Sequence, residues 1–324
     1  MHRNQSPPIR LRLAVLVLIV SLVLGLAGPV TGQEFNPMGG LSTTAGQPTV
    51  TVVQCNPMVG GAYTEGKSGK CTWDTAKRFA RLIAKDCPDA AVIGMEEVIG
   101  ADQASKNKEI LDKATGKVWE FAFESQGVND ASSGLAIFWR KDRVAFFKKL
   151  GKTEIERLDE GGGYRVRFMG VLLREVASGK PFGVFTGKIT WDGGIINGHG
   201  VTEKDRVKEA KRLKDWIRQV MASCADAPRI IAMDMNSPHG SPTYKEMNAE
   251  YENDGSDQAT HDSLLRVFGR SIMRRKLDYL WYDADAGARR SGGFASRAVR
   301  SEHFGSDHRA IWAKVRLTGR SQFM

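Results

Sequence analysis

Apolar runs that stop abruptly at polar residues recur along this chain. In the clearest of them, residues 229–236, the apolar run ends at Asp234 and Asn236, and Pro238 and Pro242 prevent its continuation. Residues two apart on a strand face the same side. The pattern therefore predicts a buried strand whose carboxyl end turns Asp234 and Asn236 toward one cleft.

Similar patterns predict the other elements. An apolar stripe with a period near 3.6 residues predicts helices at about 72–85, 103–114 and 202–222. Continuous or alternating apolar runs predict further strands at 50–56, 90–95, 118–124, 135–140, 144–150, 164–176, 181–191, 276–282 and 309–317. Strands that alternate with helices and then form hairpins predict mixed sheets with helices outside.

The first 32 residues have the pattern of an export signal. Arginines at positions 3, 10 and 12 precede an unbroken apolar run, 13–24, that is shorter than the roughly 20 residues of a membrane span. We expect a signal peptide cleaved before Gln33 and a secreted or extracytoplasmic protein, with an uncleaved anchor as the alternative. The remaining chain is expected to divide into a flexible linker, a single domain and a tail, at residues 33–48, 49–318 and 319–324.

The chain is basic, with a formal charge of +10. Cleavage after residue 32 removes three arginines and no acid, which leaves 44 basic against 37 acidic residues and a charge of +7. Such an excess favours an anionic partner, for example nucleic acid or an acidic membrane surface.

The four cysteines, Cys55, Cys71, Cys87 and Cys224, have no zinc-site spacing. In an exported chain one or two disulfides are expected, and Cys55–Cys71 is the favoured pair. The alternative is that Cys55 is only a small buried residue within its strand.

Polar residues occupy the positions where predicted strands stop or start. They are Asn56, Glu97, Glu124, Asp234 with Asn236, and Asp307 with His308. α/β proteins build binding sites at such strand ends. Oxygen ligands from Glu97, Asn56 and Asp307 would suffice for one Mg²⁺, which also keeps several waters. Asp278 lies within a predicted strand, and a carboxylate bonded to one imidazole nitrogen of His308 would raise the basicity of the other nitrogen.

Five short motifs follow one another along the chain: Q-C-N at 54–56, P-D-x-x-V-I-G-M-E-E at 88–97, M-D-M-N at 233–236, K-L-D-Y at 276–279 and S-D-H-R at 306–309. In this order and spacing the chain resembles the endonuclease/exonuclease/phosphatase superfamily over roughly residues 48–317. The resemblance implies an α/β fold, a four-layered sandwich of two facing mixed β-sheets with helices outside. It also implies a site at one mouth of the sandwich.

The resemblance implies a metal-binding role for three of the matched residues. Glu97 would be the main metal carboxylate, Asn56 would lie near the metal and the phosphate, and Asp307 would be a metal or water ligand. Mg²⁺ is the expected cofactor, with Mn²⁺ or Ca²⁺ as alternatives.

The resemblance implies catalytic roles for four further residues. Asp234 would orient or deprotonate the attacking water, Asn236 would bind phosphoryl oxygens, and Asp278 would hold His308, which acts on the phosphate. The reaction would be in-line attack on a phosphodiester, with the cation and His308 neutralising charge in the transition state.

The sequence departs from the family at two places. Many members carry N-T-H-L where this chain has Thr186–Ile189, so Lys188 replaces a histidine that serves as proton donor. We hypothesise that Lys188 forms an ion pair with Glu124 and protonates the leaving oxygen, the alternative being that Lys188 only binds phosphate. Met58 stands where apurinic-site endonucleases carry an aspartate, which together with export argues against DNA repair.

Eight cations between positions 270 and 300 flank the expected site: Arg270, Arg274, Arg275, Lys276, Arg289, Arg290, Arg297 and Arg300. They form either a solvated face or a track for a polyanion backbone, in which Arg289 and Arg290 would bind substrate. Phe294 and Phe304 would stack bases, touch lipid or pack in the core.

The remaining histidines of the mature chain, His199, His239, His261 and His303, have no metal-ligand spacing. They are predicted to be exposed or structural. His199 is the alternative source of the missing acid, because it lies in the Gly-rich loop after Lys188.

The sequence as a whole predicts a secreted, monomeric, Mg²⁺-dependent phosphodiesterase. By its resemblance it is a DNase-like endonuclease of low sequence specificity with nucleic acid as substrate. One alternative is a phospholipid phosphodiesterase of the sphingomyelinase kind, although no membrane-inserting aromatic hairpin is evident. The others are a phosphomonoesterase and a non-catalytic binding module in which Lys188 marks a decayed site.

Overall fold

The computed structural model describes residues 47–57, 70–98, 100–125, 134–155, 166–190, 195–196, 199–262, 266–267, 270–271, 274–283 and 293–317. All of them belong to one compact unit, residues 43–324. The predicted signal peptide, most of the predicted linker and the predicted tail lie outside these residues. Among the helices in these ranges, none has an apolar stretch of the length a bilayer requires.

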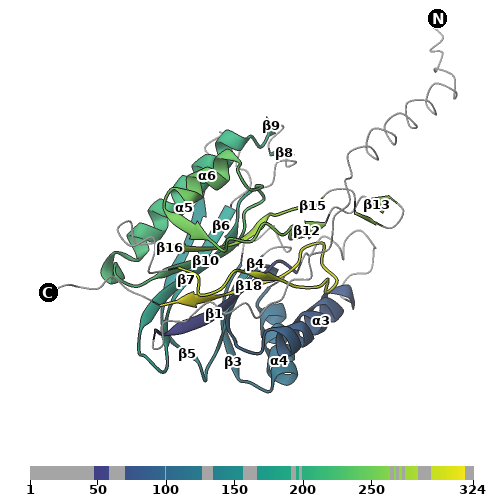
Figure 1. Ribbon diagram of the computed structural model, residues 1–324, viewed down its shortest axis with the longest axis vertical. Helices are drawn as coiled ribbons and strands as arrows, with labels where there is room; N and C mark the ends of the chain where they lie inside the picture. Colours follow the sequence, from purple (N-terminus) through teal and green to yellow (C-terminus); the bar gives the residue numbers. More distant parts are fainter. Residues whose placement is uncertain are drawn as a thin grey trace, which may run out of the picture. The chain divides into compact units, whose positions relative to one another are not determined.

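Two six-stranded sheets form the centre of this unit (Figure 1). The first has the strand order β17 (Val299–Arg300), β18 (Ile311–Arg316), β1 (Thr49–Cys55), β2 (Ala90–Val98), β4 (Gly134–Arg140), β3 (Trp119–Glu124). The second has the order β11 (Tyr251–Asn253), β16 (Asp278–Asp283), β10 (Arg229–Asp234), β7 (Pro181–Lys188), β6 (Val166–Glu175), β5 (Val144–Ile155). Each sheet has one parallel pair near its middle, β1 with β2 and β7 with β10, among antiparallel neighbours.

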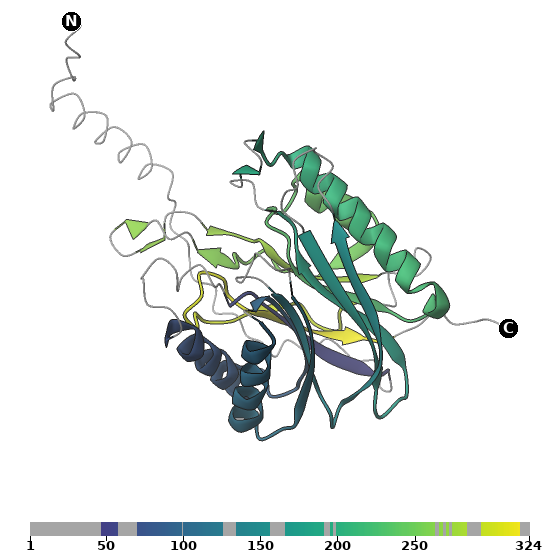
Figure 2. The same cartoon turned by 180° about the vertical axis from the view of Figure 1, so that it is seen from behind.

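Four helices cover the outer faces of the sheets in the described chain (Figure 2). They are α3 (Lys70–Asp86) and α4 (Gly100–Thr115) on the first sheet, and α5 (Glu203–Val220) and α6 (Pro242–Asn248) on the second. Phe79 and Ile83 of α3 belong to one buried apolar cluster with residues of β1 and β2, and Leu213 and Ile217 of α5 belong to another with residues of β7 and β10. The expected four-layered α/β sandwich is confirmed.

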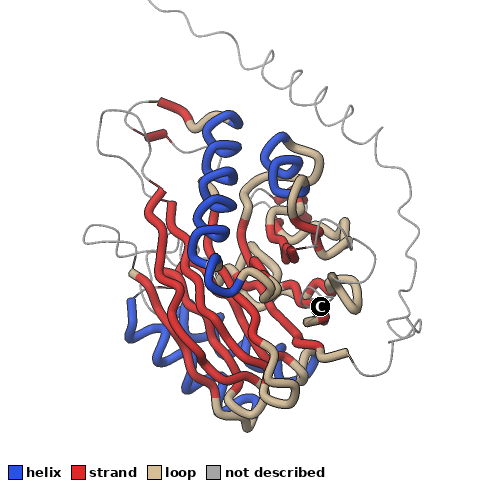
Figure 3. Tube along the Cα trace, turned by 90° about the vertical axis from the view of Figure 1, so that its left-hand side faces the viewer, coloured by secondary structure: helices blue, strands red, loops and turns tan. Residues whose placement is uncertain are grey.

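A third apolar cluster fills the space between the two sheets, which lie between the helices in Figure 3. Val52 and Ile137 of the first sheet meet Val184 and Ile230 of the second, and all four side chains are fully or almost fully buried. Near the site the sheets approach closely, because a Cβ added at Gly94 would lie only 2.8 Å from the Cβ of Ala232. A side chain there would push the two layers apart, and with them the polar groups that they carry.

The described strands and helices follow the apolar patterns closely, with shifts of a few residues at their ends. The patterns missed α6, η1 (Ala222–Cys224), β11 and β17. They also missed three small two-stranded sheets, β8 (Ile195–Ile196) with β9 (His199–Gly200), β12 (His261–Asp262) with β15 (Arg274–Arg275), and β13 (Arg266–Val267) with β14 (Arg270–Ser271). Strands of two residues are too short to carry a hydrophobic period, so backbone pairing alone defines them.

The favoured Cys55–Cys71 disulfide is wrong, because Cys55 is a free thiol. Its side chain is fully buried against the helices of the first sheet. Burial also raises the pKa of Cys55 well above its usual value, with Glu96 and Asp278 adding to the effect. The alternative of a small buried strand residue is the one that the structure supports.

Phe294 and Phe304 pack against other aromatic rings of the domain. The Phe304 ring lies 5.4 Å from that of Phe79 and is 1% exposed. Phe294 is half-buried, with its ring 6.1 Å from that of Tyr282. Core packing, rather than base stacking, explains both residues.

Candidate active site

The parallel strand pairs of the two sheets end at the same place. Asn56 follows β1, Glu97 lies near the end of β2, Lys188 ends β7 and Asp234 ends β10. Hydrogen bonds and an ion pair connect these four residues across the sandwich: Asn56 Nδ2 donates to Asp234 Oδ2 at 3.2 Å, and Lys188 Nζ lies 2.8 Å from Glu97 Oε1. The carboxyl ends of neighbouring parallel strands meet at one edge of a sheet, and here two such edges face each other.

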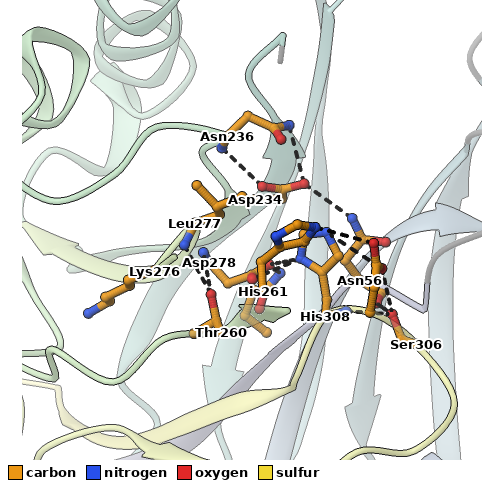
Figure 4. Close-up of polar contacts among 12 residues, drawn as sticks. Asn56, Asp234, Asn236, Thr260, His261, Lys276, Leu277, Asp278, Ser306 and His308 are labelled. Carbon is orange, nitrogen blue, oxygen red and sulfur yellow. Dashed lines mark hydrogen bonds and ion pairs between the residues drawn. The ribbon is translucent and has the colours of Figure 1, made fainter. Parts of the chain in front are cut away.

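Asp278 and His308 form a buried pair beside these strand ends (Figure 4). Asp278 begins β16 and lies opposite Asp234 in the antiparallel register. His308 Nδ1 lies 2.9 Å from Asp278 Oδ2 and 3.1 Å from Oδ1, so it donates to this carboxylate. Ser306 holds the loop in place, because its Oγ donates to the Asn56 carbonyl and accepts from His308 N.

The electrostatic field of the site favours a charged imidazole. Burial alone would lower the pKa of His308, but the carboxylates of Asp278 and Asp234 outweigh burial and hold this pKa well above its usual value. The pKa of Asp234 is raised to about 6: burial is the largest cause, the charge of Asp278 adds to it, and His308 and Lys188 oppose it. Perturbations of this kind, caused by burial and specific charge partners, are typical of functional sites.

Glu97 and Asn236 are the two non-glycine residues with positive φ in the described chain, at 53° and 49°. Such a conformation costs about 1–3 kcal/mol and persists only where the surroundings impose it. At Asn236 the imposing contacts are its own N–H, which donates to Asp234 Oδ1, and its Nδ2, which donates to the carbonyl of Ile189 at 2.8 Å. At Glu97 the register of β2 against β4 shifts. Both strained residues are among the predicted site residues.

Three polar residues that had no predicted role, Gln54, Glu96 and Thr186, join the two sheets behind the site. Gln54 Nε2 donates to Glu96 Oε2 at 3.0 Å and to Asp278 Oδ1 at 2.9 Å, and Thr186 Oγ1 donates to Glu96 Oε1 at 2.9 Å. Burial, followed by the charges of Asp234 and Asp278, raises the pKa of Glu96 well above its usual value. An acid within an otherwise apolar strand was the signal that could have found Glu96.

His261, predicted to be exposed or structural, contacts the site. Its Nε2 lies 3.3 Å from Asp307 Oδ2, and its ring centroid lies 4.9 Å from that of His308. The preceding residue, Thr260, accepts hydrogen bonds from the N–H groups of Leu277 and Asp278. No spacing along the sequence connects His261 with the other site residues, so only the fold shows the contact.

The hypothesised Glu124–Lys188 ion pair is not the pairing that the structure shows. Lys188 contacts Glu97, whereas Glu124 forms ion pairs with Lys149 and Lys152. The reason is strand order. Glu124 ends the edge strand β3 and lies near the edge strand β5, while Lys188 is on β7, two strands away from β5.

Two of the eight cations that flank the predicted site make contacts within the fold. Lys276 is buried and pairs with Asp254, and Arg300 is partly buried and donates to the carbonyl of Ala259. Arg274 and Arg275 are exposed on β15, where Arg275 lies opposite His261. The predicted substrate-binding residues Arg289 and Arg290 lie outside the described residues.

The other histidines do not join the site in the described chain. His239 is exposed, with its ring 4.3 Å from that of Tyr244. His303 Nδ1 lies 3.2 Å from the carbonyl oxygen of Ser306. The side chain of His199 lies outside the described residues, so its alternative role as an acid stays a prediction.

Two groups of three side chains in the described chain have potential ligand atoms within 4.8 Å of one another. One is Asp234, Asp278 and His308, and the other is His261, Asp307 and His308. Glu97, the expected main metal carboxylate, belongs to neither group. Carboxylates from several strands meet here with few cations between them, which fits a divalent cation bound by oxygen ligands.

Comparison with known proteins supports the same assignment of the fold. Residues 71–308 match the model of the "Endonuclease/Exonuclease/phosphatase family". Among curated proteins, none matches the chain.

Solved structures match over most of the chain at low sequence identity. An endonuclease/exonuclease/phosphatase from Bacteroides vulgatus matches with a TM-score of 0.59 and 17% identity, over 84% of this chain and 100% of the other. ANGEL2, a 2′,3′-cyclic phosphatase solved with adenosine-2′,3′-vanadate, matches with a TM-score of 0.59 and 13% identity, over 84% of this chain and 96% of the other. A mannosyl-6-phosphatase from Bacteroides thetaiotaomicron matches with a TM-score of 0.56 and 15% identity, over 82% of this chain and 98% of the other.

Proposed function

Because this chain belongs to the endonuclease/exonuclease/phosphatase family, we propose that it is a metal-dependent phosphodiesterase that cleaves nucleic-acid backbones with low sequence specificity. The observation that carries the proposal is the meeting of the buried Asp278–His308 pair with Asp234 at the ends of the central strands. A binding module without catalysis has no need for this buried charge, which is costly to maintain.

The expected divalent cation would supply positive charge to the phosphoryl oxygens. Glu97, Asn56 and Asp307 are the residues proposed to hold it. They offer two carboxylates and a carboxamide, which is the oxygen chemistry that Mg²⁺ prefers. Mn²⁺ and Ca²⁺ remain alternative ions for the same ligands.

The chain's own residues account for the movement of protons. Asp234, with a pKa of about 6, is ionised at neutral pH yet basic enough to accept a proton from an attacking water. His308 is held charged by Asp278 and would neutralise charge that develops on the phosphate. The Nδ2 atom of Asn236 donates to Asp234 Oδ2 and to the carbonyl of Ile189, which holds the amide beside Asp234, where it would orient the phosphoryl group.

Two observations favour a polyanionic substrate. The exposed Arg274 and Arg275 are on β15, which pairs with the strand that carries His261, so they flank the site. The chain also carries a net charge of +10, which becomes +7 after removal of residues 1–32. The similar structure of ANGEL2 was solved with an adenosine derivative, which supports a nucleotide ligand for this fold.

A phosphomonoester is the second candidate substrate, because one similar structure is a mannosyl-6-phosphatase. A phospholipid is less well supported. The exposed aromatics Phe146 and Phe147 are at the far end of the β5–β6 pair from the site, since Phe146 pairs with Leu173 whereas Gly187, next to Lys188, pairs with Phe168. A membrane that bound these two rings would not meet the site.

Plasmid nicking tests the proposal, with wild type, His308→Ala and the matched control His239→Ala assayed with Mg²⁺ and with EDTA. The expected result is nicking by wild type and by His239→Ala that EDTA abolishes, and none by His308→Ala. Release of phosphorylcholine from sphingomyelin and of phosphate from mannose 6-phosphate is measured in parallel. Activity on either of these but not on DNA or RNA would replace the proposed substrate class, and no activity in any divalent metal would favour a binding module.

We also propose that the protein is exported as a monomer. The basic and apolar pattern of residues 1–32 supports export. Amino-terminal sequencing of the protein from the culture medium would test it, with Gln33 as the expected first residue.

A further inference from the structure

His261, Asp307 and His308 form a compact group that shares Asp307 with the proposed Mg²⁺ ligands. The Nε2 atom of His261 lies 3.3 Å from Asp307 Oδ2, and the Nε2 atom of His308 lies 3.9 Å from Asp307 Oδ1. One carboxylate thus lies between two imidazole nitrogens, and one ligand atom of each residue lies within 4.8 Å of the others. Asp307 and His308 side chains are 8% exposed and that of His261 is 24% exposed, so the group is open on one side.

The backbone fixes the distance between the two histidines. His261 and His308 form an antiparallel β-bridge, and Arg309 N donates to the carbonyl of Thr260 at 2.7 Å. Thr260 is in turn bonded to the start of β16 through its hydroxyl group. The two rings meet edge to face at a centroid distance of 4.9 Å, on main-chain positions that the bridge holds in place.

The ring of His308 is oriented by a second carboxylate. Asp278 accepts from its Nδ1, which leaves Nε2 as the nitrogen that faces Asp307 and His261. A carboxylate on the far nitrogen of a metal-binding histidine is a recurrent arrangement, since it fixes the tautomer and raises the basicity of the ligand nitrogen.

We propose that His261, Asp307 and His308 form a binding site for a transition-metal ion of the Zn²⁺ or Co²⁺ type. Two imidazoles and one carboxylate are typical ligands of Zn²⁺ sites that keep a position open for water or substrate, whereas Mg²⁺ prefers oxygen ligands. The site shares Asp307 with the Mg²⁺ site proposed at Glu97 and Asn56, and differs from it in the two imidazoles of His261 and His308. The inference does not depend on the proposed phosphodiesterase activity.

When the site is loaded, a metal with an open coordination position would stand at Nε2 of His308, the nitrogen that faces Asp307. A Mg²⁺-loaded enzyme and a Zn²⁺-loaded enzyme would thus present different groups to a phosphate at the same place.

Cobalt spectroscopy tests the site without any substrate. Protein freed of metal by a chelator is titrated with Co²⁺, and the visible d–d absorption is recorded for wild type, His261→Ala, His261→Gln and the control His239→Ala. The expected result is one Co²⁺ bound per chain in wild type and in the control, without the charge-transfer absorption of a thiolate ligand. Zn²⁺ should displace the ion, and excess Mg²⁺ should not.

Both His261 variants should bind Co²⁺ at least about tenfold more weakly than wild type. Circular dichroism and thermal unfolding show whether the variants are folded, and the rise of the melting temperature on adding Zn²⁺ to wild type gives a measurement that needs no variant. Unchanged Co²⁺ affinity and spectrum in a folded His261 variant would overturn the proposal, as would a wild-type protein that neither binds Co²⁺ nor is stabilised by Zn²⁺. In that event the His261–Asp307 contact is a polar contact within the protein only.

Discussion

Two buried clusters of charged residues meet at the start of β16, one through Lys276 and the other through Asp278. They differ in the ratio of acidic to basic groups. In the structural cluster, Lys276 donates to Asp254 Oδ1 and to the carbonyl of Ser256, and Asp254 also accepts from the N–H groups of Ser256 and Leu280. One cation meets one anion, and backbone groups fill the remaining bonds. This cluster connects the loop after β11 to β16.

The site cluster has more acids than partners. Glu96, Asp234 and Asp278 are each at most 2% exposed, and the cations among them are His308 and, at the edge, Lys188. Burial raises the pKa of Asp234 and of Glu96, so the fold works against their ionised forms. Burial with a paired partner indicates a structural role, whereas burial with surplus negative charge indicates a site that is completed by a cation.

The largest expected effect follows from replacing one acid of the site cluster. Asp234→Asn should lower activity by about 10²–10⁴-fold, because the proposed base is lost. Its free energy of unfolding in EDTA at pH 7 should equal or exceed that of wild type. The folded pKa of Asp234, about 6, is above the unfolded value, so this carboxyl group favours folding below about pH 4 and loses that contribution as pH rises through about 6.

Activity assays and urea unfolding of the same preparations measure both quantities. If Asp234→Asn were markedly less stable than wild type at pH 7, the surplus-charge interpretation of the site cluster would be wrong.

In the structural cluster the opposite result is expected. Asp254→Asn leaves the buried Lys276 without its anionic partner, which should cost about 3–5 kcal/mol of unfolding free energy. Activity per folded molecule should stay within a few-fold of wild type. The double variant Asp254→Asn with Lys276→Met removes both charges and should recover part of the loss, which urea unfolding would measure. A large fall in turnover without a fall in stability would contradict the structural role.

Lys188 lies at the boundary of the site cluster, and its replacement tests whether it only pairs with Glu97 or donates a proton. Lys188→Met should lower kcat/KM by about tenfold, equivalent to about 1.4 kcal/mol. It should also lower the Mg²⁺ concentration needed for half-maximal activity, because the ammonium group that pairs with Glu97 is gone. A loss of 10³-fold or more in kcat, with no change in Mg²⁺ dependence, would instead identify Lys188 as the proton donor.

A smaller effect than that in the structural cluster, on stability alone, is expected outside both clusters, at the first residue of α5. Glu203 Oε1 accepts from the N–H and hydroxyl of Thr243, and Oε2 accepts from Arg206. Burial alone would raise the pKa of Glu203, but the bonds from Thr243 and then Arg206 outweigh burial and lower it. Glu203→Gln should therefore cost about 1–2 kcal/mol at pH 7.

The stabilisation by Glu203 is present above its unfolded pKa and is lost as pH falls through its lowered folded pKa. The difference between Glu203→Gln and wild type should thus shrink in acid, which is the reverse of the trend for Asp234. Urea unfolding across this pH range measures it, with Glu120→Gln as the control because Glu120 forms only an exposed ion pair with Lys141. A difference that did not change with pH would show that the charge of Glu203 is irrelevant.

Most of the fold could be predicted from the sequence, because long helices and strands show a clear hydrophobic period. The α5 pattern, for example, predicted a helix at about 202–222, and the helix spans Glu203–Val220 after a capping box formed by Thr202 and Asp205. The short strands β12 and β15 are defined only by pairing between residues distant in the sequence. A hydrophobic period cannot reveal strands of two residues.

Part of the candidate site could also be predicted from the sequence. Asn56, Asp234 and His308 stand at strand ends, where motif order marks them, and the structure brings them together. Glu96 and His261 were missed for different reasons. Glu96 precedes Glu97, and the motif assigned a role only to Glu97. His261 reaches the site through a backbone bridge to His308, which is distant in the sequence.

The polar bonds that cross between the sheets have a consequence for how the protein can be switched off. Gln54 to Asp278, Asn56 to Asp234 and Thr186 to Glu96 each join a residue of one layer to a residue of the other. Neither sheet carries the complete set of site residues by itself. A disturbance that separates the layers slightly, such as heat, pressure or a larger residue at Gly94, should therefore abolish the proposed activity before the outer helices unfold.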